Sequence, residues 1–282
     1  MVVFLNGSFI EEAEAKVSVF DRGLLYGDGL FETVRVYRRT PFRLREHLLR
    51  LREGARFLKI PIDVEIMPGV VDELLSRNAL DEGYLRITLT RGDHTGKLDL
   101  ESSGSTLLAV VTKLRPIPDA IYSEGVEAIF ASGRVSPYLG RLKKVSFLPY
   151  LVAKDEARLR GAFEAILRNA AAEVVEGATS NVFALVGDKL LSPGVAAGAL
   201  PGIARATVIE LAHEEGISFS EGSLTGKELL AASEVFLTNS MIELVPVVRM
   251  EGRPIHDGRP GRIYQLLRRR YRERVECDCH RR

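Results

Sequence analysis

The chain has 282 residues, a length that suits one large or two medium-sized domains. Its 39 basic and 38 acidic residues leave a formal net charge of +1, and 46% of its residues are hydrophobic. This composition excludes an intrinsically disordered chain, and it excludes a nucleic-acid binder that depends on bulk positive charge. What remains is an ordinary soluble globular protein.

The cysteines and the chain start bear on location. Cys277 and Cys279 are separated by one residue, too close for a disulfide that would stabilise the fold. A chain without such a disulfide is typical of a reducing compartment. The first residues lack the basic region of a secretory signal, and no apolar stretch is long enough to span a bilayer. We therefore expect a cytoplasmic protein that acts without a membrane and without nucleic acid.

In the first part of the chain, the Asn6-Gly7 turn between two apolar runs predicts a β-hairpin. Leucine and alanine residues recurring at steps of four and three predict an amphipathic helix over 42–59. The other elements expected here are a helix over 68–80 and strands over 17–20, 31–37, 84–90 and 106–113.

Pro116 and Pro118 interrupt the strand pattern and predict a linker between two domains. We expect an N-terminal α+β domain over 1–115, a linker over 116–122 and a C-terminal domain over 123–282. In the second domain we expect helices over 147–160, 203–215 and 261–276 and strands over 126–131, 165–169, 173–176, 182–186 and 234–238. This mixed order predicts the α+β class, not an alternating parallel-sheet fold.

Lys143 and Glu176 are the first candidates for chemistry. Lys143 falls between a strand and a helix, where most lysines are merely solvated. Glu176 ends an apolar strand, so it is either an exposed turn residue or a carboxylate that needs a partner such as a cationic ring nitrogen.

Three further places could hold an anion. Pro201-Gly202 precedes a helix whose first N–H groups could face a phosphate, although proline and glycine are also common helix-start residues. Arg50 shares a helix face with His47 and could make a forked contact with phosphate, or simply face solvent. Thr238-Asn239-Ser240 follows a strand and is either an anion-holding turn or an ordinary loop.

The end of the chain is less promising. Cys277-Asp278-Cys279-His280 lacks a second pair of ligands at useful spacing, so we predict no metal site. The basic run Arg268-Arg269-Arg270 has glutamates nearby and predicts a solvated helix face.

Taken in chain order, seven blocks resemble the class IV, or fold-type IV, pyridoxal-phosphate enzymes, which include branched-chain aminotransferases, D-amino-acid aminotransferases and aminodeoxychorismate lyases. The blocks are the N-terminal hairpin with Tyr26–Glu32, His47–Leu51, Tyr84–Arg86, the Lys143 segment, Glu176–Phe183, Leu200–Arg205, and Phe236–Ser240 with Val245–Val247. The resemblance implies a two-domain fold with the active site between the domains, a pyridoxal 5′-phosphate cofactor and a homodimer.

The resemblance also implies residue roles. Lys143 would bind the cofactor aldehyde as a Schiff base and move a proton between the substrate Cα and cofactor C4′, and Glu176 would keep the pyridine nitrogen protonated. The other cofactor-binding residues would be Arg50, Ile203, Ala204, Asn239 and Ser240. The substrate-binding residues would be Phe31, Thr33, Tyr84, Arg86 and Met241.

These blocks do not all indicate the same type of reaction. Thr33 and the Thr238–Ser240 turn resemble the lyase group, whereas Tyr84-x-Arg86 resembles the aminotransferases. Phe147 stands where the family often has a tyrosine near the cofactor hydroxyl. Arg91 and His94 lie in the region of the D-amino-acid carboxylate trap without matching it.

We predict an aminotransferase that moves an amino group between an amino acid, branched-chain or hydrophobic, and a 2-oxo acid. The alternative is an aminodeoxychorismate lyase, which eliminates pyruvate and gives 4-aminobenzoate. A remote third hypothesis is a non-enzymatic interaction module that uses the basic C-terminal helix.

Overall fold

The computed structural model describes residues 1–94, 96–101 and 104–279, and the chain divides into two compact units. The first unit comprises Met1–Arg115, Leu142–Phe147 and Val275–Arg282, and the second comprises Pro116–Arg141 and Leu148–Arg274. Lys143 thus groups with the first unit, whereas we expected it in the second domain. The expected linker also belongs to the second unit, and a short helix, α4 (Ala120–Ser123), begins within it.

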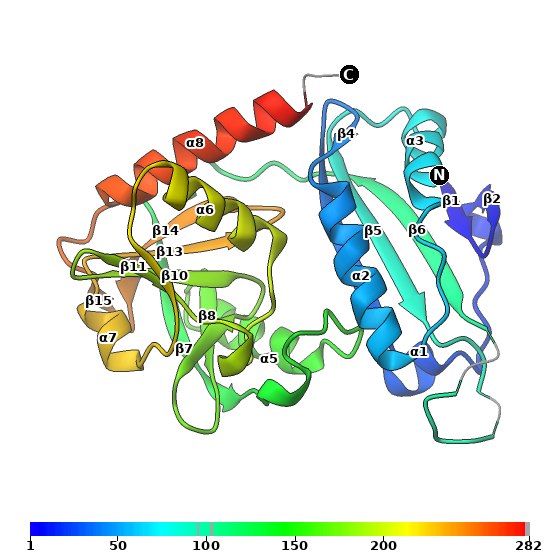
Figure 1. Ribbon diagram of the computed structural model, residues 1–282, viewed down its shortest axis with the longest axis horizontal. Coiled ribbons are helices and arrows are strands. Elements are labelled where there is room, and N and C mark those ends of the chain that lie inside the picture. Colours follow the sequence, from blue (N-terminus) through cyan, green and yellow to red (C-terminus); the bar gives the residue numbers. More distant parts are fainter. Residues whose placement is uncertain (95, 102–103, 280–282) are drawn as a thin grey trace. The chain divides into compact units, whose positions relative to one another are not determined.

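Within the described part of the first unit, six strands form one antiparallel sheet of order β2-β1-β6-β5-β3-β4 (Figure 1). They are β1 (Val2–Leu5), β2 (Ser8–Glu11), β3 (Gly29–Tyr37), β4 (Thr40–Pro41), β5 (Gly83–Thr90) and β6 (Thr106–Lys113). The helices are α1 (Arg22–Tyr26), α2 (Leu44–Leu58) and α3 (Met67–Arg77). Helix α2 packs on β3, and α3 packs on β1 and β6.

Hydrophobic periodicity explains α2. Leu48, Leu51 and Ala55 are buried along one side of the helix, which confirms the predicted helix over 42–59. The strand predicted over 17–20 is wrong, because this segment forms no strand and Val19 and Phe20 are 68% and 63% exposed. Alternating apolar residues indicate a strand only where a neighbouring strand can pair with them.

The second unit contains nine described strands in one mixed sheet of order β12-β11-β10-β13-β14-β7-β8-β9, with β15 paired to β14. They are β7 (Val126–Arg134), β8 (Glu164–Arg168), β9 (Val174–Gly177), β10 (Asn181–Val186), β11 (Lys189–Ser192), β12 (Phe219–Glu221), β13 (Glu234–Asn239), β14 (Glu243–Met250) and β15 (Arg253–Pro254). Three neighbouring pairs are parallel, β11 with β12, β14 with β7 and β7 with β8.

Helices flank this sheet: α5 (Leu148–Leu159), α6 (Ile203–Glu214), α7 (Gly226–Ala231) and α8 (Arg262–Cys279) accompany α4. Helix α5 packs on β7 and β8, where Ala153 and Ala157 are buried, and α6 packs on β13 and β12. Short 3₁₀ helices cover Glu12–Glu14, Pro137–Leu139 and Val195–Ala197. With two sheets and helices in mixed order, the predicted α+β class is confirmed.

The pairing of β10 with β13 positions one end of this sheet. Asn181 at the start of β10 lies opposite Thr238 near the end of β13. The turn that leads from Glu176 on β9 to Asn181 therefore lies beside the end of β13, where the Asn239 Nδ2 donates to the Thr179 carbonyl at 2.9 Å.

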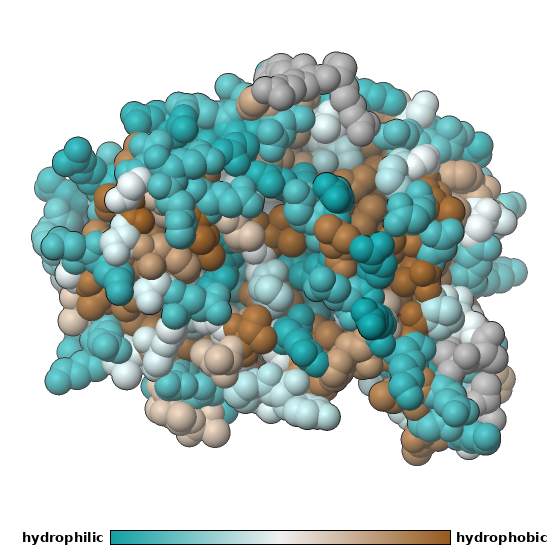
Figure 2. All heavy atoms as spheres, in the orientation of Figure 1, coloured by the Kyte–Doolittle hydropathy of each residue, from teal (hydrophilic) through white to brown (hydrophobic). Residues whose placement is uncertain are grey.

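Helix α8 has a buried apolar side that includes Tyr264 and Tyr271 and a charged outer side. Arg270 pairs with Glu215 at 2.6 Å, and Arg274 pairs with Glu214 at 2.6 Å. Figure 2 shows the hydrophilic side chains that gather over this helix, in agreement with the predicted solvated face. In the described ranges, no helix combines the length and the apolar character that crossing a bilayer requires.

Candidate active site

In the first unit, four of the five predicted substrate residues lie on one face of the sheet, and the fifth, Met241, belongs to the second unit. Thr33 on β3 lies opposite Arg86 on β5, and Phe31 lies two residues before Thr33 on the same side of its strand. Tyr84 precedes Arg86 by two residues and shares that face. The Arg86 guanidinium carbon lies 3.6 Å from the centre of the Phe31 ring, so an arginine and an aromatic surface are presented together.

Lys143 lies against the same aromatic ring. The Phe31 N–H donates to the Lys143 carbonyl at 2.8 Å, and the Val145 N–H donates to the Gly29 carbonyl at 2.9 Å. This backbone pairing fixes the segment on the start of β3 and places the Lys143 Nζ 4.6 Å from the centre of the Phe31 ring. Phe147 meets Phe31 edge to face at 5.7 Å between ring centres. The pairing is the physical reason why Lys143 belongs to the first unit.

On the opposite side of β3, Glu32 forms a buried cluster with two residues of α2. The Arg50 Nε and Nη2 donate to its two carboxylate oxygens at 2.8 and 2.6 Å, and the His47 Nδ1 lies 2.6 Å from Glu32 Oε2. Glu32 and His47 are 1% and 2% exposed. The guanidinium of Arg50 is therefore held in one orientation by a forked contact, instead of moving freely on a solvated helix face.

The charges in this cluster are well defined. Burial alone would raise the pKa of Glu32, but Arg50 and His47 outweigh burial and lower it to about 2. Burial lowers the pKa of His47, against the opposing effect of the Glu32 carboxylate. At neutral pH, Glu32 is thus a carboxylate and His47 a neutral imidazole. In the sequence, Glu32 was part of the Tyr26–Glu32 block and no role was predicted for it. Because side chains alternate along a strand, its place between Phe31 and Thr33 puts it on the opposite face, toward α2.

In the second unit, Glu176 is 6% exposed at the end of β9. Its Oε2 accepts a hydrogen bond from the Leu200 N–H at 3.0 Å, and its carboxylate also accepts one from the Tyr150 hydroxyl. The Leu200 carbonyl in turn accepts from the Asn181 Nδ2 at 2.9 Å. Glu176 and the loop that leads into α6 are therefore tied together.

The start of α6 approaches its surroundings closely. Gly202 precedes Ile203 and Ala204, and a Cβ placed on Gly202 would lie only 2.0 Å from the Asn181 Oδ1. The N-cap residue of α6 is Gly202, which makes no side-chain hydrogen bond to the first N–H groups of the helix. A helix start of this kind presents N–H groups to an anion. Arg205 is otherwise engaged, since it pairs with Glu221 at 2.7 Å and contacts Ser192.

The turn after β13 is built by Asn239. Its Oδ1 accepts from the backbone N–H groups of Met241 and Ile242 at 2.8 and 2.9 Å. The Asn239 side chain thus shapes the turn that presents Ser240 and Met241. The buried Thr238 Oγ1 has no hydrogen-bond partner among the residues described.

Sequence reasoning missed Glu164, which supports the turn that follows Glu176. This fully buried carboxylate accepts from the Thr179 and Ser180 hydroxyls at 2.7 and 3.1 Å. Nothing in its local sequence marks it, since the two hydroxyls come from a turn that is distant in the chain.

Arg91 does not form a carboxylate trap. It is 2% exposed, and its Nε and Nη2 donate to Asp28 at 2.7 and 3.1 Å. Its Nη1 donates to the Leu58 and Leu100 carbonyls at 2.8 Å each. Arg91 is therefore a structural tie, and the ring of His94 packs on Tyr26 instead.

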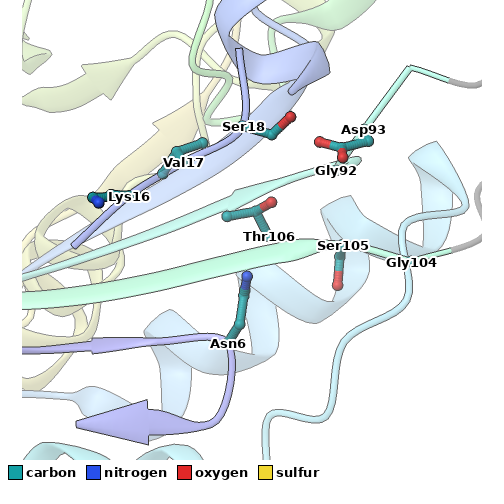
Figure 3. Close-up of a pocket in the computed structure, with 9 residues that line it drawn as sticks. All are labelled: Asn6, Lys16, Val17, Ser18, Gly92, Asp93, Gly104, Ser105 and Thr106. Atoms are coloured by element: carbon teal, nitrogen blue, oxygen red, sulfur yellow. The ribbon is translucent and has the colours of Figure 1, made fainter. Parts of the chain in front are cut away.

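A separate polar pocket of about 320 Å³ lies in the first unit. Figure 3 shows its walls, with Lys16 and Asp93 on different sides of the cavity. Asn6, Ser105 and Thr106 also line it, and none of these residues was predicted to act. Within the described ranges, no three His, Cys, Asp or Glu side chains lie close enough to hold a metal ion, and His280 lies outside those ranges.

The family model for class IV aminotransferases matches residues 29–250. A putative branched-chain-amino-acid aminotransferase of Methanocaldococcus jannaschii is 38% identical, over 97% of this chain and 96% of the relative. The aminodeoxychorismate lyase of Bacillus subtilis is 30% identical, over 99% and 96% of the two chains.

The fold agrees with these relatives. The solved structure of a branched-chain aminotransferase from the archaeon Thermoproteus uzoniensis, with norvaline, superposes with a TM-score of 0.91 at 32% identity and covers 100% of this chain and 96% of that chain. Another solved branched-chain amino acid aminotransferase, which holds pyridoxamine 5′-phosphate, also superposes with a TM-score of 0.91. The predicted resemblance is confirmed, and the non-enzymatic interaction module is set aside. This chain belongs to the class IV aminotransferase family, whose members are enzymes that use pyridoxal phosphate.

Proposed function

We propose that this enzyme transfers an amino group between a hydrophobic amino acid and a 2-oxo acid. The observation that carries the proposal is the grouping of Lys143 and Arg86 on the Phe31 ring, at 4.6 and 3.6 Å from its centre. An amine that can move a proton, a guanidinium that can hold a carboxylate and an aromatic surface are the groups that such a substrate needs.

Bound pyridoxal phosphate would supply an aldehyde that captures amines and a ring that accepts electrons. Toward that group, the Lys143 Nζ would be the attachment point and the base that moves the substrate Cα proton. Glu176 would hold the ring nitrogen. Arg50, with the Ile203 and Ala204 N–H groups and Ser240, would hold the phosphate.

The residues present fit this cofactor. Gly202 packs closely on the Asn181 Oδ1, where a Cβ would collide, and it makes no side-chain hydrogen bond to the first N–H groups of α6, which a phosphate could contact. The forked contact with Glu32 fixes Arg50 in advance, so little entropy is lost when it holds an anion.

Arg86 would bind the substrate carboxylate. Burial lowers the pKa of Arg86, yet a guanidinium stays charged at neutral pH. The rings of Phe31 and Phe147, together with Thr33, Tyr84 and Met241, would surround the side chain, which favours apolar substrates.

Replacement of Lys143 tests the proposal directly. Lys143→Ala should lower kcat by at least about 10²–10⁴-fold, since the general base is lost, and should abolish borohydride-reducible attachment of the cofactor. Lys144→Ala is the matched control, because it removes a neighbouring charge without touching the proposed role. A Lys143→Ala enzyme with unchanged turnover would refute the assignment.

The lyase remains the second candidate, because the Bacillus subtilis relative spans the whole chain and Thr33 and the Thr238–Ser240 turn resemble the lyase group. Incubation with an amino acid alone, in its L and in its D form, separates the two reactions. An aminotransferase should convert its cofactor to the pyridoxamine form, which changes the visible absorbance. A strict lyase should keep its spectrum and release pyruvate from aminodeoxychorismate.

A homodimer is part of the proposal. Its support is a run of exposed apolar side chains in the first unit, where Val19, Phe20 and Leu24 are 68%, 63% and 69% exposed. Leu24→Glu should shift the sedimentation coefficient from dimer to monomer. Leu159→Glu, at an equally exposed leucine of the second unit, should leave it unchanged.

A cytoplasmic location is also proposed. It is supported by Cys277 and Cys279, which are both free thiols in the structure. Fractionation of cells that express the protein checks the location.

A further inference from the structure

We infer that the Tyr150 hydroxyl is a positioning group for Glu176, which it holds in the orientation that a cationic ring nitrogen requires. This inference rests on the proposed function, because it assumes that Glu176 faces the cofactor ring. It adds to that function a residue on α5 that none of the predicted motifs contains.

The geometry of α5 brings Tyr150 to Glu176. Tyr150 lies in the first turn of the helix, and its ring packs against the buried alanine-rich cluster between α5 and the sheet. Ala153 and Ala157, which follow at helical spacing, belong to the same cluster. The ring is thus fixed by packing, and the hydroxyl at its end donates to the Glu176 carboxylate.

The hydroxyl remains a donor over the working pH range. Burial, and then the neighbouring Glu176 carboxylate, raise the pKa of Tyr150. Tyr150 therefore keeps its proton, and the hydrogen bond keeps its direction from tyrosine to carboxylate. An O–H donor stabilises the ionised form of a buried carboxylate, and the ionised form is the one that attracts a protonated ring nitrogen.

Tyr150 and Leu200 hold Glu176 from two different elements. The Leu200 N–H donates to Oε2 at 3.0 Å from the loop before α6, and Tyr150 donates from α5. With both donors in place, the carboxylate cannot rotate without losing a hydrogen bond. Phe147, three residues before Tyr150, offers no hydroxyl, so Tyr150 provides the phenol in this part of the chain.

The test uses the apoenzyme and two ligands, pyridoxal phosphate and its analogue with carbon in place of the ring nitrogen. Tyr150→Phe should weaken binding of pyridoxal phosphate about tenfold, since it removes one hydrogen bond to a charged group. It should leave the affinity for the carbon analogue unchanged. In a Glu176→Gln background, Tyr150→Phe should cause no further loss.

Tyr264→Phe is the matched control, because it removes another buried tyrosine hydroxyl of the second unit, one that donates to the Tyr122 carbonyl at 3.1 Å. It should change neither affinity. The inference is overturned if Tyr150→Phe binds pyridoxal phosphate like the wild type, if it weakens both ligands equally, or if the loss persists with Glu176→Gln. Failure of the proposed function looks different, since the unmodified enzyme would then bind pyridoxal phosphate without converting it to the pyridoxamine form when an amino acid is added.

Discussion

The two units each bury a carboxylate, and each carboxylate is held in a different way. Glu32 in the first unit contacts a guanidinium and an imidazole, with the closest atoms 2.6 Å away. The contacts described for Glu176 in the second unit come from neutral donors, a backbone N–H and a phenol. A cation balances the charge of the carboxylate that it pairs with, whereas a neutral donor stabilises a carboxylate without balancing its charge.

We therefore expect different roles for these two glutamates. Glu32 orients Arg50, so its replacement should lower the free energy of unfolding. Under the proposed function, Glu176 would hold the ring nitrogen of the cofactor, so its replacement should lower the rate of the reaction.

The largest effect is expected from Glu32→Gln. This change leaves the buried His47 and the half-buried Arg50 without the carboxylate that they contact, which should lower the free energy of unfolding by about 3–5 kcal/mol. Urea denaturation measures it. The control Glu65→Gln removes an exposed partner of Arg52 and should cost less than about 1 kcal/mol. If Glu32→Gln and Glu65→Gln lowered the free energy of unfolding equally, the structural role given to Glu32 would be wrong.

Glu176→Gln should do the opposite. It keeps the shape of the side chain and removes its charge, so kcat should fall by about 10²–10³-fold. The free energy of unfolding should change by only about 1 kcal/mol, because the amide oxygen of glutamine can still accept from the Leu200 N–H. A large loss of stability with normal turnover would contradict this assignment.

The dependence of stability on pH should report Glu32 and His47. The pKa of Glu32 is about 2 in the folded protein against 4.5 in the unfolded chain, so its contribution is present above pH 4.5 and is lost as pH falls toward 2. The lowered pKa of His47 acts in the same direction below about pH 6.5, since the unfolded chain binds the proton first.

Acidification from pH 7 should therefore lower the free energy of unfolding, with the Glu32 part on the order of 3 kcal/mol. Denaturation at a series of pH values measures this slope. In Glu32→Gln the portion below pH 4.5 should become shallower, and an unchanged slope there would count against the charge assignment.

The smallest effect is expected from Asn181→Ala, which removes the tie to the Leu200 carbonyl. It should cost about 1 kcal/mol of stability and weaken pyridoxal phosphate binding a few-fold, because the loop that holds Glu176 and starts α6 is loosened. Asn78→Ala is the control in the first unit, where the Asn78 side chain donates to the Val2 and Leu74 carbonyls and accepts from the Val2 N–H at 2.9 Å each. It should lose at least as much stability without any change in cofactor affinity.

Local pattern predicted much of the secondary structure. The helix expected over 42–59 is Leu44–Leu58, and the strand expected over 106–113 is Thr106–Lys113, because hydrophobic periodicity is a direct record of which side is buried. Strand β14 was missed. It carries Pro246 opposite Phe236 inside the sheet, a position where proline is rare because it has no N–H to donate.

The contacts between distant segments could not be predicted in this way. Lys143 pairs through its backbone with Phe31, and Glu164 supports hydroxyls of the turn after Glu176, yet neither relation leaves a local signal. His47 was grouped with Arg50 on a helix face that solvent could explain, and only the contacts with Glu32 show why His47 is buried and Arg50 half-buried.

The first unit is assembled from three separate stretches of chain, and the last of them begins within α8. A fragment cut after Arg115 would therefore lack the lysine segment that pairs with β3, and would also lack the end of α8. Any chimera that exchanges this unit with that of a relative must carry all three stretches, so a single crossover point is not enough. Chain topology thus constrains how the two units can be recombined as modules.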